Sequence, residues 1–257
     1  MQPYELASKD VYHLIQLSDC HLLAETTAEY QGIRPYQHLQ RLLSTLRAEP
    51  CDLLVLTGDL TQDHSLASYH HLARLLADWP SPVCYLPGNH DDPELMRQAF
   101  HQAPFISTKD IYSEHWRWLL LNTKSETPAG HFPAERCAEL AQQLAQHQVP
   151  VWLFSHHHPR PIGASIDRHG WQEVELFLQT VAAFPAVKGL SHGHCHYAYH
   201  QVDPASGLQL VGCPATSVQF LHSADWQTVD RGPQGLQWQF FADGTVHWHL
   251  LQQPAFE

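Results

Sequence analysis

Apolar and polar positions alternate with two different periods along most of the chain. Short apolar runs predict strands at 11–17, 52–57, 83–86, 149–154 and 186–190. The run at 52–57 is nearly continuous, which is typical of a strand buried on both faces. Segments with a helical period predict helices at 35–48, 65–78, 93–100, 133–146 and 171–184. In the first predicted helix, one face carries Leu39, Leu42, Leu43 and Leu46. This order predicts βαβ units, and 111–122 adds one or two strands.

The last sixty or so residues have a different pattern, in which strands follow one another without helices. These strands are predicted at 197–202, 208–212, 236–241 and 245–251. Turn sequences at 203–207 and 242–244 separate them, so we expect an antiparallel meander. The simplest architecture for the whole chain is an α/β fold of four layers, αββα, with two β-sheets packed face to face and helices outside. No linker or repeat divides the chain, so residues 1–257 are predicted to form a single domain.

Five of the predicted strands end in clusters of acidic, amide and imidazole side chains. In chain order the clusters are Asp19-Cys20-His21, Gly58-Asp59, Gly88-Asn89-His90-Asp91, His156-His157-His158 and Gly193-His194-Cys195-His196. Ligands of α/β sheets bind beyond the carboxyl ends of parallel strands, so we expect these clusters to converge if the strands run parallel. One such cluster arises easily by chance or as a helix cap, whereas five in succession favour a functional site.

The residue types in these clusters indicate a metal site. Carboxylate, imidazole and amide oxygen ligands suit Mn, Fe, Zn or Mg. An irregular strand end lets Asp19 and His21 reach one ion, and His194 and His196 offer one imidazole to each of two ions. Asp59 follows a glycine, and a carboxylate there can bridge two ions about 3.5–4 Å apart.

Composition changes this picture in two ways. The chain holds 22 histidines against 14 lysines and arginines, and most of the histidines are interpreted as surface residues, like His247 and His249 on a predicted strand of the tail. The formal charge of −12 argues against nucleic acid or an anionic membrane as a partner. Two divalent ions (+4), two aspartates (−2) and one hydroxide (−1) leave a net +1, which suits a phosphodiester monoanion.

The cysteines and the N-terminus bear on the compartment. The six cysteines are scattered without a CxxC pair, so we expect free thiols, with Cys20 and Cys195 as spacers between ligands. The N-terminal residues lack the features of a signal peptide, and no apolar stretch approaches 18 residues. We therefore expect a cytoplasmic protein without a membrane span.

The five clusters together resemble the signature of calcineurin-like metallophosphoesterases. Further runs at 58–63, 156–159 and 214–220 resemble the bacterial class III cyclic-nucleotide phosphodiesterases of the CpdA type. The resemblance spans essentially the whole chain. It implies a metallo-dependent phosphatase-like fold with two mixed sheets. It also implies that the first ion is held by Asp19, His21, Asp59 and His196, and the second by Asp59, Asn89, His156 and His194.

The resemblance also implies an activity and further roles. A hydroxide between two ions, Fe and/or Mn with Zn, Co or Mg as alternatives, would hydrolyse 3′,5′-cAMP to 5′-AMP. His90 would contact phosphate and protonate the leaving oxygen as the catalytic residue, and the substrate contacts would be His21, Asp59, Asn89, His90 and His196. His157 and His158 would either support the metal ligands from behind or only form hydrogen bonds within the loop, and Asp63 is open to the same two interpretations.

Several alternatives stay open. The substrate is cAMP or another diester, such as a glycerophosphodiester, another cyclic nucleotide or a nucleotide. A non-catalytic scaffold is disfavoured because no ligand is missing, and a nuclease because no basic run is present. Specificity is expected from 91–122, with Phe105 and His115 as candidate walls, and Arg160 is expected at the substrate rim. The protein is predicted to be a monomer or a homodimer.

Overall fold

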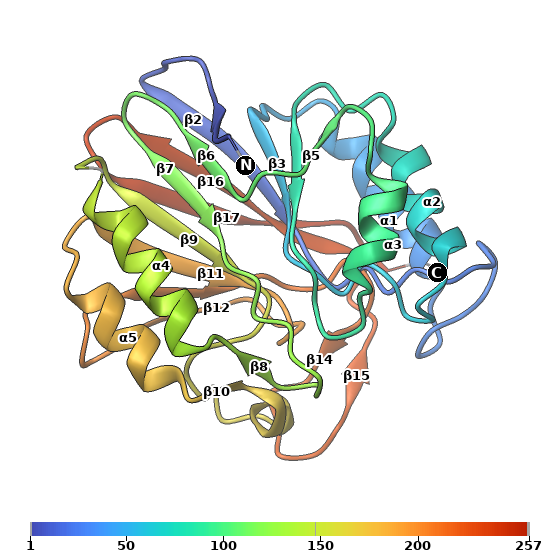
Figure 1. The fold of residues 1–257 in the computed structure, drawn as a ribbon. Helices are drawn as coiled ribbons and strands as arrows, with labels where there is room; N and C mark the ends of the chain where they lie inside the picture. The colour runs from blue at the N-terminus through green and yellow to red at the C-terminus, as the bar shows by residue number, and fades with distance from the viewer. Residues whose placement is uncertain (1, 147, 256–257) are drawn as a thin grey trace.

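Two mixed β-sheets stack face to face in the computed structural model (Figure 1), which describes residues 2–146 and 148–255. The first sheet has six strands, in the order β17 (Val246–Gln252), β16 (Gln234–Phe241), β2 (Val11–Leu17), β3 (Leu53–Leu56), β4 (Val83–Tyr85) and β5 (Phe105–Ile106). The second has seven, in the order β1 (Tyr4–Glu5), β6 (Asp110–Tyr112), β7 (Arg117–Leu120), β9 (Val151–Ser155), β11 (Val187–His192), β13 (Gln209–Gly212) and β12 (Tyr199–Val202). The assignment of residues 1–257 to a single domain stays a prediction. Residues 1, 256 and 257, at the ends of that predicted domain, lie outside the described residues.

Helices cover the outer face of each sheet. Figure 1 shows α1 (Pro35–Leu46), α2 (Leu66–Leu76) and α3 (Pro93–Ala99) on one side, and α4 (Ala134–Ala145) and α5 (Val174–Ala182) on the other. The α1 helix starts at a proline, whose fixed φ suits the first helical turn, and it buries the predicted face of Leu39, Leu42, Leu43 and Leu46. The α2 and α3 helices are capped by the side chains of Ser65 and Asp92.

Three apolar clusters fill the spaces between these layers. In β3, Leu54 and Leu56 pack toward α1, α2 and α3, while Leu53 and Val55 pack between the sheets, because side chains alternate along a strand. The central cluster contains fully buried tryptophans, among them Trp152 and Trp238, whose ring centroids lie 5.0 Å apart. The third cluster lies under α4 and α5. The predicted four-layer αββα fold is confirmed.

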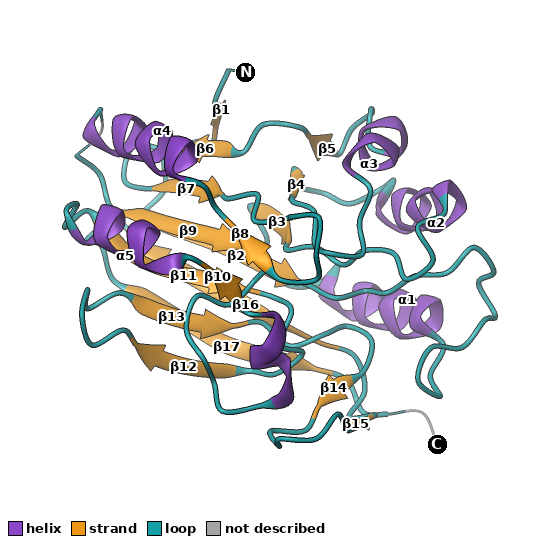
Figure 2. Ribbon diagram, turned by 60° about the horizontal axis from the view of Figure 1, so that its bottom comes forward, coloured by secondary structure: helices purple, strands orange, loops and turns teal. Residues whose placement is uncertain are grey.

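The tail differs from the predicted meander. Strands β12 and β13 pair antiparallel in the seven-stranded sheet, whereas β16 and β17 pair antiparallel in the six-stranded sheet, where β16 lies against β2. The meander prediction was wrong because an alternating pattern identifies a strand but not the sheet that it joins. The two ends of the chain therefore exchange sheets: the C-terminal β16 and β17 complete the sheet of β2, and the N-terminal β1 pairs with β6 in the other sheet (Figure 2).

Short elements complete the fold. Two small sheets are formed by β8 (Gly130–His131) with β10 (Trp171–Gln172), and by β14 (Gln219–Phe220) with β15 (Thr228–Val229). A 3-10 helix, η1, spans Ser165–His169. The predicted helix at 171–184 is shorter than expected because its first two residues form β10. None of the helices among the described residues has the length and apolar character needed to cross a bilayer.

Candidate metal centre

The five polar clusters meet between the carboxyl ends of strands from both sheets. Strands β2, β3 and β4 run parallel in one sheet, and β9 and β11 run parallel in the other. Just beyond the first sheet, the backbone N–H of Asp19 donates to Gly58 O at 2.9 Å and that of His21 to Asp59 O at 2.9 Å. The predicted convergence is thus confirmed, although the clusters come from two sheets and not from one edge.

Five of the seven predicted ligands have left-handed backbone conformations. Their φ values are 54° for Asp19, 47° for His21, 50° for Asp59, 65° for His194 and 48° for His196. Non-glycine residues avoid this region because it brings Cβ close to the backbone, and such strain concentrates at functional sites. The left-handed residues at positions i and i+2 bring both side chains of Asp19-x-His21 to one group with His196, whereas His194 joins His156 in the other imidazole pair.

Glycines in the clusters allow close approach. A Cβ on Gly88 would lie 2.2 Å from Oδ1 of Asp59, and a Cβ on Gly193 would lie 1.9 Å from Oγ of Ser18 and 2.7 Å from Oδ2 of Asp19. Contacts this short are sterically forbidden, so only glycine fits at both positions. Gly88 therefore permits close approach within the first sheet, and Gly193 permits the close approach between the two sheets.

Each of the four imidazoles in the predicted ligand set is oriented by a hydrogen bond on its far nitrogen. His156 Nδ1–H donates to Thr57 O at 2.7 Å, His196 Nδ1–H to Val218 O at 2.7 Å and His194 Nε2–H to His169 O at 3.0 Å. His21 Nδ1–H donates to Oε1 of Gln62 at 2.8 Å. A carbonyl oxygen only accepts, so these bonds place a proton on the outer nitrogen and leave the inner nitrogen facing the site. This arrangement is usual for histidines that bind metal.

The inner nitrogens face one another in pairs. Nε2 of His21 lies 3.1 Å from Nε2 of His196, and Nδ1 of His194 lies 3.2 Å from Nε2 of His156. Two lone pairs at that separation repel each other unless a cation or a proton lies between them. Burial lowers the pKa of His21 to about 3 and lowers the pKa of His194 as well, so these rings are neutral.

Two buried carboxylates lie beside the imidazole pairs. Oδ2 of Asp59 is 3.8 Å from Nε2 of His21, and its Oδ1 is 3.5 Å from Nε2 of His156. Oδ1 of Asp19 is 3.3 Å from Nε2 of His196. Burial alone would lower the pKa of His156, but the carboxylates of Asp59 and Asp19 outweigh it and raise that pKa to about 9. The site thus carries negative charge that calls for cations.

The donor set fits two metal ions. The Asp19, His21 and His196 ligand atoms lie within 4.8 Å of one another, as do those of Asp19, Asp59 and His156. Oδ1 of Asn89 lies 3.2 Å from Nε2 of His156 and completes the set of seven. Asp59 presents one oxygen to each imidazole pair, as a bridging carboxylate would. These groups could bind metal, and they are of the types that Mn, Fe and Zn accept.

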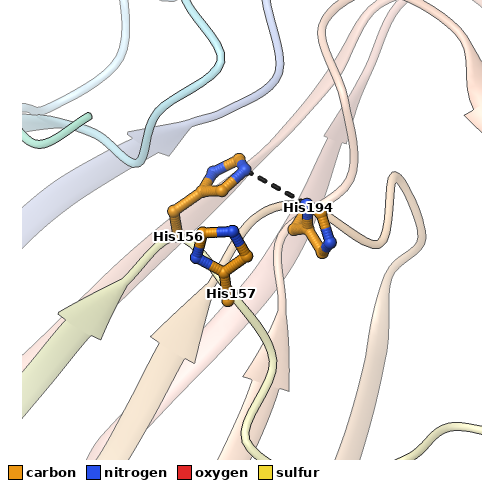
Figure 3. A group of neighbouring side chains, drawn as sticks. All are labelled: His156, His157 and His194. Atoms are coloured by element: carbon orange, nitrogen blue, oxygen red, sulfur yellow. Dashed lines mark hydrogen bonds between the residues drawn. The ribbon is translucent and has the colours of Figure 1, made fainter. Parts of the chain in front are cut away.

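Figure 3 separates the ligand candidates of the triple histidine from their neighbour. A nitrogen of His156 points at His194, while the ring of His157 lies beside both. Nε2–H of His157 donates to Pro128 O at 3.1 Å, and its Nδ1 accepts from Oγ1 of Thr123 at 2.8 Å. Both nitrogens are therefore occupied by protein partners, which favours His156 as the ligand of this run. The His157 ring packs against the two ligand candidates and limits their movement.

His90 lies at the edge of the site, with a ring nitrogen within 4.8 Å of the ligand atoms of His21 and Asp59. Its backbone N–H donates to Oδ1 of Asp59 at 2.8 Å, so the position of His90 is tied to that carboxylate. Its half-buried ring lies 5.2 Å from the ring of His21 and stacks at 5.9 Å on that of His64. His90 thus lies beside the candidate ligands without belonging to either facing imidazole pair.

Other sequence-based expectations differ in outcome. Cys20 and Cys195 are buried, and burial raises the pKa of Cys20 to about 12 and that of Cys195 as well, so both are thiols and not thiolate ligands. Asp63 accepts hydrogen bonds from the backbone N–H groups of Ala24 and Ser65, which is the loop interpretation. The expectation of a mostly exposed histidine population was incomplete, because four buried histidines lie outside the predicted ligand set: His38, His157, His158 and His192.

The cavity beside the cluster has different walls from those predicted. It encloses about 440 Å³ and is lined by His21, Tyr30, Gln31, Asp59, Asn89, His90, Pro128, Ile166, His169, His194, His196, Phe220, Trp226 and Thr228. None of these described lining residues comes from 91–122, so the prediction of walls from that region was wrong. Phe105 instead stacks on Phe100 in the core, and Arg160 pairs with Asp203 and Glu175 away from the cavity. His115 lies near Glu114, also outside the lining.

Comparison with known proteins identifies the family. Residues 12–198 match the family described as calcineurin-like phosphoesterase. The 3′,5′-cyclic adenosine monophosphate phosphodiesterase CpdA of Escherichia coli K12 is 32% identical over 98% of this chain and 94% of its own length. A probable cyclic nucleotide phosphodiesterase of Pseudoalteromonas is 33% identical over 89% of this chain and 87% of its own length.

A solved structure supports the fold. A dimetal phosphatase from Danio rerio superposes with a TM-score of 0.65 at 15% identity, covering 95% of this chain and 99% of its own. At that identity the likeness concerns the fold alone, and it agrees with the layers described above. The sequence prediction of a metal-dependent phosphoester hydrolase is confirmed by the family match. The chain belongs to the calcineurin-like phosphoesterase family.

Proposed function

We propose that the chain hydrolyses the cyclic phosphodiester of 3′,5′-cAMP to 5′-AMP at a dinuclear metal centre. The observation that carries the proposal is the pair of facing imidazole nitrogens, at 3.1 and 3.2 Å, with one carboxylate beside both pairs. The substrate class is supported by the relatives named as cyclic nucleotide phosphodiesterases, which cover nearly the whole chain.

The seven side chains divide into two sets that share one member. Asp19, His21 and His196 would hold the first ion together with Asp59, and Asn89, His156 and His194 would hold the second with the same Asp59. When bound, two such ions, with Fe and/or Mn favoured and Zn, Co or Mg as alternatives, supply Lewis acidity and activate water for attack on phosphorus. They also give an acidic protein a local positive field in which an anionic ester binds.

The chain's own residues orient this chemistry. The carbonyls of Thr57, Val218 and His169 fix three imidazoles before any substrate arrives, so no reorganisation is needed during reaction. His90, at the edge of the site, is the group that donates a hydrogen bond or a proton to the departing oxygen. His21, Asp59, Asn89, His90 and His196 all line the cavity, which supports their role as substrate contacts.

The metal requirement and the substrate are tested together. Purified protein is treated with a chelator, reloaded separately with Fe, Mn, Zn, Co or Mg, and assayed on cAMP, cGMP, bis(p-nitrophenyl) phosphate and a glycerophosphodiester. We expect the stripped protein to be inactive, Fe or Mn to restore it, and cAMP to give 5′-AMP. Full activity of the stripped protein on any diester would contradict the proposal. Faster turnover of another natural diester than of cAMP would make that diester the assigned substrate.

Two variants with matched controls test the residue roles. His156→Ala should lose metal and activity, whereas His200→Ala, on the exposed part of β12, should lose neither. His90→Ala should lower kcat on cAMP by about 10²–10⁴-fold. The same variant should lower kcat far less on bis(p-nitrophenyl) phosphate, because p-nitrophenolate leaves without a proton. Equal losses on both substrates would assign His90 a role other than the acid.

The remaining expectations accompany this proposal. The cytoplasmic location and the choice between monomer and homodimer stay predictions. Sedimentation of the purified protein distinguishes the two oligomeric states.

A further inference from the structure

Aromatic side chains form one wall of the cavity beside the candidate metal centre. Phe220 stacks on the ring of His196 with centroids 4.0 Å apart and an interplanar angle of 3°. Trp226 meets Phe220 edge to face at 5.2 Å and stacks on His169 at 6.2 Å. These rings form a continuous series that starts at a proposed metal ligand and ends at Trp226, and all of them line the cavity.

The outermost ring of this series is unusually accessible. Trp226 is 48% exposed, and among the described residues only three other large apolar side chains are comparably exposed: Leu176, Val202 and Leu250. Trp226 alone of these four lines the cavity. A half-exposed indole at the rim of a polar site provides a flat apolar surface without a protein partner on part of its area.

The wall is fixed relative to the metal centre. The 3-10 helix η1, which is the short helix between β10 and β14 in Figure 2, is joined to the β14–β15 hairpin by Ser165 N–H donating to Ser223 O at 2.8 Å. Leu221 N–H donates to Gln227 O at 2.9 Å and closes the loop that carries Trp226. At the end of η1, the His169 carbonyl accepts from His194, so the residue that stacks on Trp226 also orients a proposed ligand.

The charge of the cavity indicates which part of a ligand this wall takes. The lining residues include no lysine or arginine within the described chain, so the phosphate has to be met at the metal centre. The wall itself consists of aromatic ring faces together with Ile166 and Pro128. Every nucleobase has a π-face, and stacking on an aromatic side chain stabilises it without reading its hydrogen-bonding edge.

We infer that Trp226, together with Phe220 and His169, is the nucleobase-binding wall of this site, with Trp226 as the specificity-determining residue for nucleotides over phosphoesters that lack a base. The inference rests on the proposed function in that the ligand is a nucleotide. It assigns the base to the β14–β15 hairpin and η1.

Product binding tests the wall separately from catalysis. The metal-loaded protein is titrated with 5′-AMP and with ribose 5-phosphate, which carries the same phosphate without a base. Trp226→Ala should weaken 5′-AMP binding by between about 5-fold and 150-fold and leave ribose 5-phosphate unchanged. Trp226→Phe should retain part of the preference, and Leu176→Ala, with comparable exposure on α5, should retain all of it.

The outcomes separate this inference from the proposed function. The inference of a nucleobase-binding wall is overturned if Trp226→Ala binds 5′-AMP as tightly as the original protein, or if its affinities for 5′-AMP and ribose 5-phosphate fall equally. In either case, hydrolysis of cAMP by the same preparation would leave the proposed function in place. If the protein binds 5′-AMP through Trp226 but does not hydrolyse cAMP, the nucleobase-binding wall is supported and the proposed substrate is contradicted.

Discussion

Gln62 offers a test of how the candidate metal centre is organised. Three of the four candidate ligand imidazoles are oriented by backbone carbonyls, which substitution cannot remove, but His21 donates to the side-chain oxygen of Gln62 at 2.8 Å. Replacing Gln62 by Leu removes the acceptor while keeping a side chain of similar length. Gln62→Glu keeps an acceptor oxygen and serves as the matched variant.

The expected magnitude follows from the burial of His21. This residue is 2% exposed, so its Nδ1–H in Gln62→Leu would be left without a partner and without water. An unsatisfied buried donor costs about 1–3 kcal/mol. Loss of such an orienting partner typically lowers metal affinity by about 10- to 100-fold. We therefore expect Gln62→Leu to weaken metal binding by about that factor and to lower kcat/KM in parallel at limiting metal.

Competition against a chromogenic chelator measures metal affinity, with the melting temperature of the stripped protein recorded alongside. If Gln62 only stabilises the loop, both variants should melt at lower temperature while metal affinity stays the same. Metal affinity of Gln62→Leu within about twofold of the original would therefore refute the role of the Gln62–His21 hydrogen bond. The same conclusion would follow if Gln62→Glu lost as much affinity as Gln62→Leu.

Three further changes have expected outcomes. Gly88→Ala places a Cβ 2.2 Å from Oδ1 of Asp59 and should lower activity by at least about 100-fold in kinetic assays. The control Gly207→Ala, whose Cβ meets nothing within 4 Å, should lose about 1 kcal/mol of stability in urea melts and keep its activity. Trp152→Ala, in the core between the sheets, should lower the free energy of unfolding by about 3–5 kcal/mol, and a loss below 1 kcal/mol would contradict the packing described. Burial would raise the pKa of Asp167, but hydrogen bonds from one imidazole and three backbone N–H groups lower it to about 2. The stability that this carboxylate contributes is thus complete above its ordinary pKa and lost as the pH falls toward 2. The loss in free energy of unfolding caused by Asp167→Asn, measured in urea melts, should therefore shrink from pH 5 to pH 3. A loss that stays constant over this range would count against the role of the ionised carboxylate.

Periodicity predicted the layers because burial leaves a regular pattern. The strand at 11–17 coincides with β2, and the leucine face of 35–48 is the buried face of α1. The partners of the tail strands were not predictable in the same way. β13 and β16 both read as alternating strands, yet they join different sheets. β13 pairs with β11, which is near in sequence, whereas β16 pairs with β2, which lies at the other end of the chain.

The metal ligand candidates were predictable because each follows a strand and belongs to a short motif. Trp226 and His169 gave no comparable signal, since they lie in a loop and a 3-10 helix without periodic pattern. Gln62 stood within a segment that resembles the family, but nothing in the sequence assigned it to His21. A loop residue becomes recognisable only when the fold brings it to the cavity.

The exchange of sheets between the chain ends has a consequence during synthesis. Strand β2 leaves the ribosome early, but its neighbour β16 begins only at residue 234. At about 5–20 residues per second the intervening chain takes roughly 10 to 40 seconds to make, and during that time β2 has an unpaired edge. A chain truncated before residue 234 would keep every proposed metal ligand and still lack the strand that covers this edge. Nascent and truncated chains are therefore expected to depend on chaperones.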